Sequence, residues 1–197
     1  MILIGVNRSP YTRRVAIALH AYGVRYGQRD LNGFGHRAEV RAANPLGRIP
    51  ALVLDDGRAL AESNAIAWYL AQGSDLVPGD AFAHTQMLQW MFFEQYEHEP
   101  SLAVLRYARV TAADPQAFAV RLPSLTAKAQ GVLGVMQRQL ESRPYIGGDA
   151  MSVADLVLYP NTHFADEAGV RLDDYPAVAA WVERVASHPR HVPMTAP

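Results

Sequence analysis

Two short segments carry the groups best suited to bind a small charged molecule. Glu62 and Ser63 stand where a helical pattern begins. A helix start offers N–H groups that bind a carboxylate, and an acid accepts from an ammonium group; alternatively, Ser63 is an ordinary N-cap and Glu62 a solvated acid. Ile49 precedes Pro50 directly before an apolar strand. If that peptide bond is cis, the backbone of Ile49 faces outward and can pair with an extended peptide-like ligand; if it is trans, Pro50 is an ordinary strand start.

The composition narrows the chemistry further. The 197 residues are 50% hydrophobic, which is enough for real cores, and their net charge of -1 argues against nucleic acid or an anionic membrane as a partner. There is no cysteine, so disulfides, thiolate metal sites and chemistry that uses a protein thiol are excluded. No stretch approaches the roughly 18 apolar residues of a membrane span, and no basic leader is present. We therefore expect a cytoplasmic protein that acts on small molecules.

The first part of the chain mixes strand and helix signals. An apolar run at residues 2–6 predicts a strand, and Ser9 before Pro10 predicts the N-cap and first residue of a helix that ends at Gly23. The further elements expected here are a strand within residues 24–31, a weak helix over 36–43, strands over 51–54 and 58–60, and a helix that opens at 62.

After a linker rich in Gly, Ser, Asp and Pro at residues 72–80, the strand signals vanish. The helical segments expected are 82–110 with a kink or break at Pro100, 115–140, 152–167, and one from Pro176 to before Pro189. Ser152 and Asp155 resemble a capping box, with Asp in place of the usual Glu or Gln. The chain thus divides into an α/β domain over residues 1–74 and an all-helical domain over residues 82–197.

Four motifs, in this order and spacing, resemble those of the cytosolic glutathione transferases. They are Ser9-Pro10-Tyr11-Thr12, Asn-Pro-x-Gly-x-Ile-Pro-x-Leu at residues 44–52, Glu62-Ser63-x-Ala65-Ile66, and Ser152-x-x-Asp155. The resemblance covers essentially the whole chain, and Phe-Phe-Glu-Gln-Tyr-Glu-His-Glu-Pro at residues 92–100 resembles a bacterial subgroup. It implies a fold of α/β plus all-α type, with a thioredoxin-like N-terminal domain followed by a GST-type helical domain.

The resemblance implies that glutathione binds to the first domain. In this family the proline at the position of Pro50 is cis, and the backbone of Ile49 would pair with the cysteinyl part of glutathione. Glu62 and Ser63 would bind the γ-glutamyl end, which carries an ammonium and a carboxylate on one carbon. The candidates for the cation that binds the glycyl carboxylate are Arg48, which is the first choice, and its rivals His36 and Arg37.

Conjugation requires the thiolate of glutathione, because a neutral thiol is a poor nucleophile and its pKa is near 8.5. A hydroxyl aimed at the sulfur and a helix N-terminus behind it both favour the anion. Ser9 stands where the serine-using classes of the family place that hydroxyl, although from the residues alone it is as readily an N-cap only. Tyr11 and Thr12 are its rivals, because other classes use a tyrosine near the end of this strand.

The implied function is a transferase that joins glutathione, as co-substrate, to small apolar electrophiles, with no metal or redox cofactor. The residues expected in the second-substrate pocket of the helical domain are Tyr96, Arg106 and Tyr107. We expect a structural role for Asp155, and packing or surface roles for His98 and His163, which lack metal-binding spacing. A non-catalytic glutathione- or ligand-binding protein, and a glutathione-dependent isomerase or dehalogenase, stay open as alternatives. By family analogy we expect a homodimer, with no nucleic-acid or membrane partner.

Overall fold

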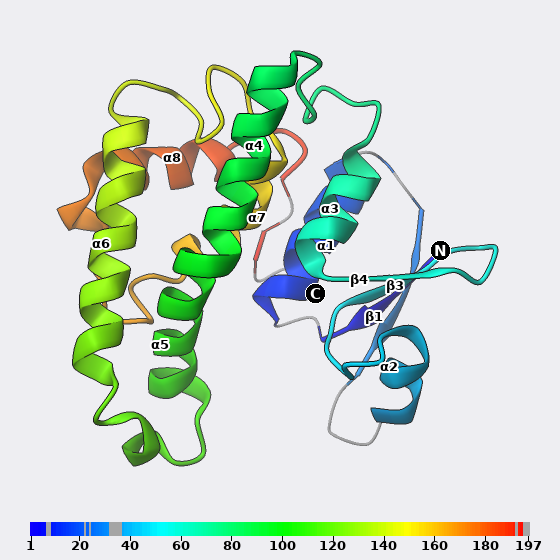
Figure 1. Ribbon diagram of the computed structural model, residues 1–197, viewed down its shortest axis with the longest axis horizontal. Coiled ribbons are helices and arrows are strands. Elements are labelled where there is room, and N and C mark those ends of the chain that lie inside the picture. The colour runs from blue at the N-terminus through cyan, green and yellow to red at the C-terminus, as the bar shows by residue number, and fades with distance from the viewer. Residues whose placement is uncertain (7–8, 22, 24, 32–36, 192, 195–197) are drawn as a thin grey trace. The chain divides into compact units, whose positions relative to one another are not determined.

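The structure is a computed structural model in which all residues are described except 7–8, 22, 24, 32–36, 192 and 195–197. The chain folds into two compact units, which are residues 1–77 together with 188–197, and residues 78–187 (Figure 1). The final segment therefore belongs to the first unit, whereas the sequence placed it with the helical domain.

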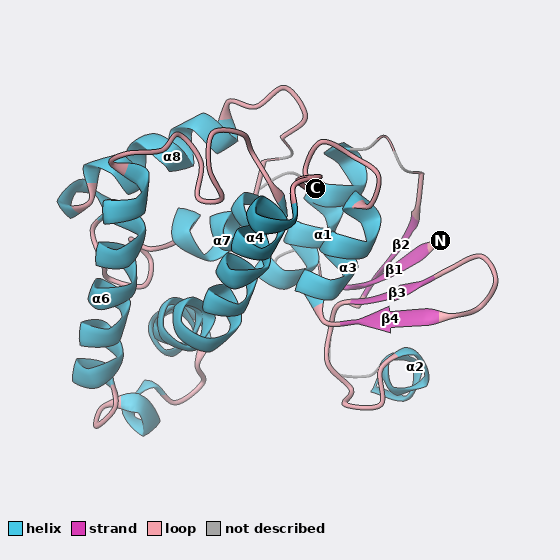
Figure 2. Cartoon of the chain, turned by 45° about the horizontal axis from the view of Figure 1, so that its top comes forward, coloured by secondary structure: helices cyan, strands magenta, loops and turns pink. Residues whose placement is uncertain are grey.

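A four-stranded sheet forms the centre of the first unit (Figure 2). Its strands are β1 (Ile2–Gly5), β2 (Gly27–Asp30), β3 (Ala51–Val53) and β4 (Ala59–Ala61), in the order β2-β1-β3-β4. β1 pairs in parallel with β2 and antiparallel with β3, and β4 pairs antiparallel with β3. A parallel pair needs a crossover connection, which α1 (Pro10–Ala21) provides.

Alternation along β1 gives the sheet two apolar faces, because successive side chains of a strand point to opposite sides. Leu3 belongs to one buried cluster and Ile4 to the other. The first cluster consists of Leu3, Leu52, Val15 and Ala16 of α1, and Ile66 of α3 (Ser63–Ala71). The second consists of Ile4, Leu31 and Val40 of α2 (Arg37–Ala43). Helices α1 and α3 therefore share one core, and α2 contributes to the other.

The C-terminal segment is fastened to α1 by a buried arginine. The Arg13 side chain is only 3% exposed. Its Nη2 donates to the carbonyl oxygen of Pro193 at 2.9 Å, and its Nε donates to that of Met194 at 3.3 Å. These bonds join residues that are 180 and 181 positions apart in the sequence, so local sequence patterns do not predict them.

The second unit is all-helical. Its elements are α4 (Ala81–Phe93), the π-helix η2 (Glu94–Ala103), α5 (Val104–Arg106), the π-helix η3 (Tyr107–Thr111), the 3₁₀ helix η4 (Pro115–Phe118), α6 (Leu122–Leu140), α7 (Val153–His163), the 3₁₀ helix η5 (Leu172–Asp174) and α8 (Pro176–Ala186). Helical winding continues through Pro100, where the sequence predicts a kink or break. Pro100 has no N–H to donate to the carbonyl of Tyr96, four residues earlier, and that carbonyl accepts from the Nζ of Lys128 at 3.2 Å. None of the described helices combines the length and the apolar character needed to cross a membrane.

Asp155 holds the start of α7 in the core of the second unit. Its side chain is fully buried. Its carboxylate accepts hydrogen bonds from the N–H of Ile146 at 2.8 Å, the N–H and hydroxyl of Ser152 at 2.9 and 3.1 Å, and the indole N–H of Trp181 at 2.8 Å. The structural role that the sequence predicts for Asp155 is thus confirmed, and the carboxylate also ties α7 to α8.

We expect Asp155→Asn to lower the free energy of unfolding by about 3 kcal/mol, because an amide has one acceptor oxygen and turns N–H groups toward buried donors. Urea unfolding measures the change. The matched control is Asp149→Asn in the preceding turn, where the acid is exposed and only 3.8 Å from Arg143; it should change the free energy by no more than about 0.5 kcal/mol. Equal stability of the Asp155→Asn variant and the wild type would contradict the assignment.

Candidate functional site

Ser9 caps α1 with its backbone and leaves its hydroxyl available. Its N–H donates to the carbonyl oxygen of Val6 at 2.9 Å, and its own carbonyl accepts from the N–H of Arg13 at 3.0 Å, with Pro10 as the first helical residue. The sequence prediction of a Ser-Pro helix start is therefore confirmed. Within the described part of the chain, nothing hydrogen-bonds to the Ser9 hydroxyl, which is partly exposed at a helix N-terminus. The hydroxyl is thus not used for capping and can donate to a ligand.

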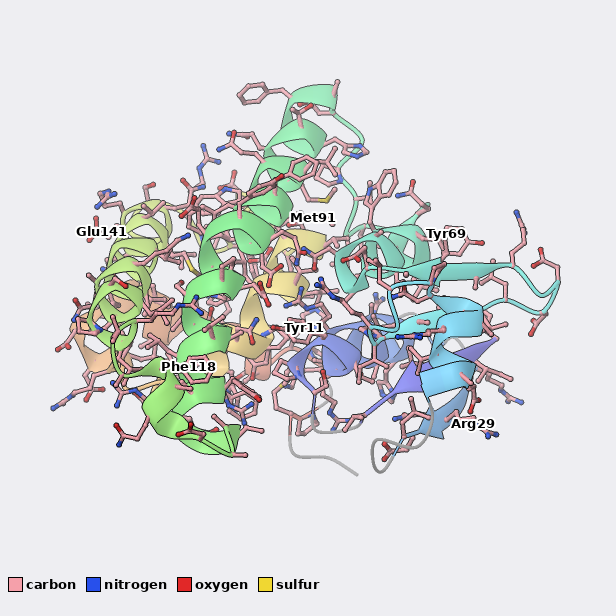
Figure 3. All side chains as sticks on the ribbon, turned by 60° about the horizontal axis from the view of Figure 1, so that its bottom comes forward. Tyr11, Arg29, Tyr69, Met91, Phe118 and Glu141 are labelled. Atoms are coloured by element: carbon pink, nitrogen blue, oxygen red, sulfur yellow. The ribbon has the colours of Figure 1, made fainter. Side chains whose placement is uncertain are left out.

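The two rival hydroxyls lie in different surroundings. Thr12 is fully buried, and its Oγ1 accepts from the N–H of Val6 at 3.3 Å. It packs so tightly on Gly5 that a Cβ at that glycine would lie 2.4 Å from Oγ1. Tyr11, labelled in Figure 3, is partly buried, and the guanidinium carbon of Arg14 lies 5.3 Å from the centre of its ring. Burial removes Thr12 from reach of a ligand and leaves Tyr11 as the remaining rival of Ser9.

The turn before β3 presents an unpaired stretch of backbone. The Ile49–Pro50 peptide bond is cis, as expected from the resemblance. The buried Asn44 side chain shapes the turn, since its Oδ1 accepts from the N–H of Leu46 at 3.1 Å and its Nδ2 donates to the carbonyl of Arg48 at 2.8 Å. No described residue hydrogen-bonds to the N–H or C=O of Ile49. The sequence pointed to Ile49 but not to Asn44, although an Asn at the start of an Asn-Pro-x-Gly turn is the signal for such a bond.

The start of α3 has a strained backbone. Glu62 has φ 63° and ψ 110°, and it is the one non-glycine residue with positive φ in the described chain. Its carbonyl accepts the first helical bond, from the N–H of Ile66 at 2.9 Å. Ser63 is 7% exposed, whereas Glu62 is exposed and its side chain makes no capping bond. Positive φ costs a non-glycine residue about 1–3 kcal/mol and is often retained at functional sites.

The cations expected for a carboxylate lie around α2 and the following turn. Arg48 is exposed, and no described residue forms an ion pair with it. Arg41 of α2 packs over Gly47, where a Cβ would lie 3.3 Å from its Nε, so a second exposed cation borders the turn. The sequence did not point to Arg41. His36 lies outside the described residues, as does the side chain of Arg37.

The three residues expected in a second-substrate pocket have separate surroundings in the helical unit. Tyr96 is 75% exposed on η2. The Nε of Arg106 donates to a carboxylate oxygen of Glu167 at 2.7 Å. Tyr107 packs edge-on against Phe118, which Figure 3 labels, with ring centres 5.8 Å apart. The described contacts do not join these three side chains to one another, and their place in a pocket stays a prediction.

The two histidines singled out in the sequence take part in packing, as predicted. His98 is buried, and its Nε2 lies 2.8 Å from the hydroxyl of Thr162. His163 contacts the rings of Tyr159 and Phe164, with centres 5.3 and 4.9 Å apart. Burial lowers the pKa of His163, which favours its neutral form. The described residues contain no group of three or more His, Asp or Glu side chains that could hold a metal ion.

The fold and these features match one family along most of the chain. Residues 3–77 match the family model described as "Glutathione S-transferase, N-terminal domain", and residues 108–184 match "Glutathione S-transferase, C-terminal domain". The chain belongs to the glutathione S-transferase family, with a thioredoxin-like N-terminal domain and a helical C-terminal domain.

Similar proteins agree with this assignment. A glutathione S-transferase from Pseudomonas fluorescens Pf-5 has 40% sequence identity and a TM-score of 0.95, with 99% of this chain and 98% of that chain covered. A glutathione transferase from Burkholderia graminis, with two glutathione molecules bound per subunit, has 28% identity and a TM-score of 0.84, with 96% and 84% covered. The disulfide-bond oxidoreductase YfcG of Escherichia coli is 30% identical over 160 residues, which are 78% of this chain and 74% of YfcG.

We expect Glu62→Gly to raise the free energy of unfolding by about 1 kcal/mol. Glycine adopts positive φ without the 1–3 kcal/mol penalty, and its greater freedom in the unfolded chain offsets only about 0.5–1 kcal/mol of that gain. Glu62→Ala keeps a Cβ and is the control, which should give no such gain. Both changes are measured by urea unfolding, and a glycine variant less stable than the alanine variant would contradict the strain.

Proposed function

We propose that this protein is a serine-type glutathione transferase that joins the glutathione thiolate to small apolar electrophiles. Membership of the family supports the use of glutathione. The single observation that carries the finer assignment is the Ser9 hydroxyl, which stands at the N-terminus of α1 with no hydrogen bond inside the described chain. It is therefore able to donate to the sulfur of a bound glutathione.

The energy needed for this activation is modest. The pKa of a thiol, near 8.5, must fall by about 1.5 units for the thiol to be half ionised at pH 7, and this shift corresponds to about 2 kcal/mol. A hydrogen bond to a charged group contributes about 1.5–3 kcal/mol, and a helix N-terminus adds about 0.3–1 kcal/mol. Ser9 at the start of α1 combines both effects, so these two contributions suffice without a metal ion.

The rest of the first unit suits the remainder of glutathione. The unpaired N–H and C=O of Ile49 can form two backbone bonds with the cysteinyl residue, in the manner of an added strand. The γ-glutamyl ammonium is assigned to Glu62, and its carboxylate to the Ser63 hydroxyl and the N–H groups at the start of α3. The ammonium and the carboxylate of the γ-glutamyl end then each meet a group that can bind them.

The glycyl carboxylate is assigned to Arg48, which is exposed and has no ion-pair partner in the described chain. Arg41 adds positive charge at the same turn, and His36 and Arg37 remain rivals. A guanidinium suits this task, because its planar fork matches a carboxylate. Tyr96, Arg106 and Tyr107 stay our prediction for the electrophile pocket.

The lack of cysteine limits the thiol–disulfide chemistry open to this protein. YfcG is named as a disulfide-bond oxidoreductase. The 197 residues of this chain contain no thiol of their own that could form a mixed disulfide with a substrate. Any thiol–disulfide chemistry would have to use glutathione alone. A glutathione-dependent isomerase or dehalogenase would use the same thiolate, and a non-catalytic binder would use the same pocket without turnover.

We further propose that the protein is cytoplasmic and forms a homodimer. Phe82 and Phe92 support the dimer, since these large aromatic side chains on α4 are 71% and 64% exposed in the single chain.

Removal of the Ser9 hydroxyl tests the proposal. We expect Ser9→Ala to lower kcat/KM for conjugation to an activated aryl halide by about 10- to 100-fold, which corresponds to the loss of one hydrogen bond to a charged atom. The affinity for glutathione, measured by calorimetry, should change by less than about 3-fold, because the bond is made to the thiolate.

Tyr11→Phe is the matched control and should keep kcat/KM within about 3-fold of the wild type. Loss of activity in Tyr11→Phe together with full activity in Ser9→Ala would mean that Tyr11, and not Ser9, donates the hydrogen bond to the thiolate. A wild-type protein that binds glutathione but conjugates no member of a panel of aryl halides, epoxides and enones would be the non-catalytic binder.

A further inference from the structure

We propose that Arg14 is a positioning residue, which holds the start of α3 through Asn64 in the place where Glu62 and Ser63 meet the γ-glutamyl end of glutathione. The inference rests on the proposed function. It concerns Arg14 and Asn64, neither of which takes part in the proposed formation of the thiolate.

Arg14 is one of the largest side chains that are fully buried in this protein, at 0% exposure. A guanidinium is always charged and is costly to remove from water, so an arginine is kept in such a place only where polar groups and a ring face hold it. The Nη1 of Arg14 donates to the Oδ1 of Asn64. Its guanidinium carbon also lies 5.3 Å from the centre of the Tyr11 ring, which is cation–π distance.

Asn64 places this bond at the proposed site. It is the second residue of α3 and directly follows Ser63, and its side chain is 7% exposed. Glu62, two residues earlier, has the strained φ of 63°. A strained backbone persists only where its surroundings hold it, and the Arg14–Asn64 bond fixes the first turn of the helix beside it.

The bond also links the helix that follows Ser9 to the helix that begins at Ser63. Ser9 lies at the start of α1, five positions before Arg14, and the neighbouring residues Val15 and Ile66 pack in one buried cluster. The two helices are therefore in contact where Arg14 reaches Asn64. A displacement of α3 would move Ser63 relative to Ser9, so that the γ-glutamyl end and the sulfur of glutathione could no longer both be bound.

Arg13 provides a matched comparison. It is the preceding residue of the same helix and is also buried, at 3% exposure, but it donates to the carbonyl oxygens of Pro193 and Met194 in the C-terminal segment. Loss of either arginine removes a buried charge and its hydrogen bonds. Only the loss of Arg14 releases the start of α3.

The experiment is a double-mutant cycle read out by the dissociation constant of glutathione from calorimetry on the full chain. We expect Arg14→Met and Asn64→Ala each to weaken binding by about 10-fold, and the double variant to bind no more weakly than the weaker single variant, because the two residues act through one bond. Arg13→Met should lower the melting temperature but change the dissociation constant by less than about 3-fold.

A second readout separates positioning from direct action on the sulfur. The ultraviolet absorbance of the bound thiolate, followed against pH, gives the pKa of the glutathione thiol. This pKa and kcat at saturating glutathione should stay unchanged in Asn64→Ala and Arg14→Met, because only binding of the γ-glutamyl end is affected. Arg14→Lys, which keeps a charged donor, should recover part of the affinity that Arg14→Met loses.

Any of three results would overturn the inference. The first is an Arg14→Met variant that binds glutathione as well as Arg13→Met does, and the second is a double variant in which the two single increases in the dissociation constant multiply. The third is a pKa of the glutathione thiol that rises in Arg14→Met and not in Asn64→Ala. If Arg14→Met does not fold, the Asn64→Ala variant decides alone, because an unchanged affinity for glutathione in that variant would contradict the inference.

A wild-type protein that binds no glutathione would refute the proposed function as well. A wild-type protein that binds glutathione, together with variants of unchanged affinity, would refute this inference alone.

Discussion

Backbone N–H and C=O groups in a folded protein need partners, and those of Ile49 have none among the described residues of this chain. They lie directly before β3, a strand paired on both sides by β1 and β4, so further pairing inside the sheet is not open to them. Asn44, buried beneath the turn, holds the chain in this path by bonds to the backbone on either side. The proposed ligand is a peptide, and a peptide backbone supplies the donor and the acceptor that Ile49 lacks. The rest of the proposed site is assigned to the thiol, the γ-glutamyl end and the glycyl carboxylate of that peptide.

Two parts of the proposed ligand, its thiolate and its γ-glutamyl carboxylate, are assigned to helix starts. Ser9 begins α1 and Ser63 begins α3, and both helices pack on the same face of the sheet. A helix N-terminus carries partial positive charge and unpaired N–H groups, which suit a thiolate in one case and a carboxylate in the other. The two buried arginines of α1 bind different segments of the first unit. Arg13 donates to the C-terminal segment, and Arg14 donates to Asn64 of α3.

Local rules of the chain were enough to predict much of this. The Ser-Pro start of α1 and the box at Ser152 and Asp155 are each set by neighbouring residues, so their patterns are visible in the sequence. The two-part organisation followed from the point where strand signals stop. The cis bond before Pro50 was expected from the family resemblance alone, because the base rate for proline favours trans.

The features that the sequence did not predict depend on tertiary contacts. The pairing of Arg14 with Asn64 spans 50 positions and that of Arg13 with Pro193 spans 180, and no local pattern encodes either. The helix that continues through Pro100 is of the π type, which propensity rules do not anticipate. The positive φ of Glu62 is imposed by its surroundings against the preference of the residue.

The amide of Ile49 reports directly on whether glutathione completes the hydrogen bonding of this backbone. Its hydrogen exchange can be followed by NMR in ¹⁵N-labelled protein, with and without saturating glutathione. We expect the ligand to slow exchange at Ile49 by at least about 10-fold, because an unpaired amide becomes a donor in a ligand-bound strand. An unchanged exchange rate at Ile49 in a protein shown to be saturated with glutathione would contradict it.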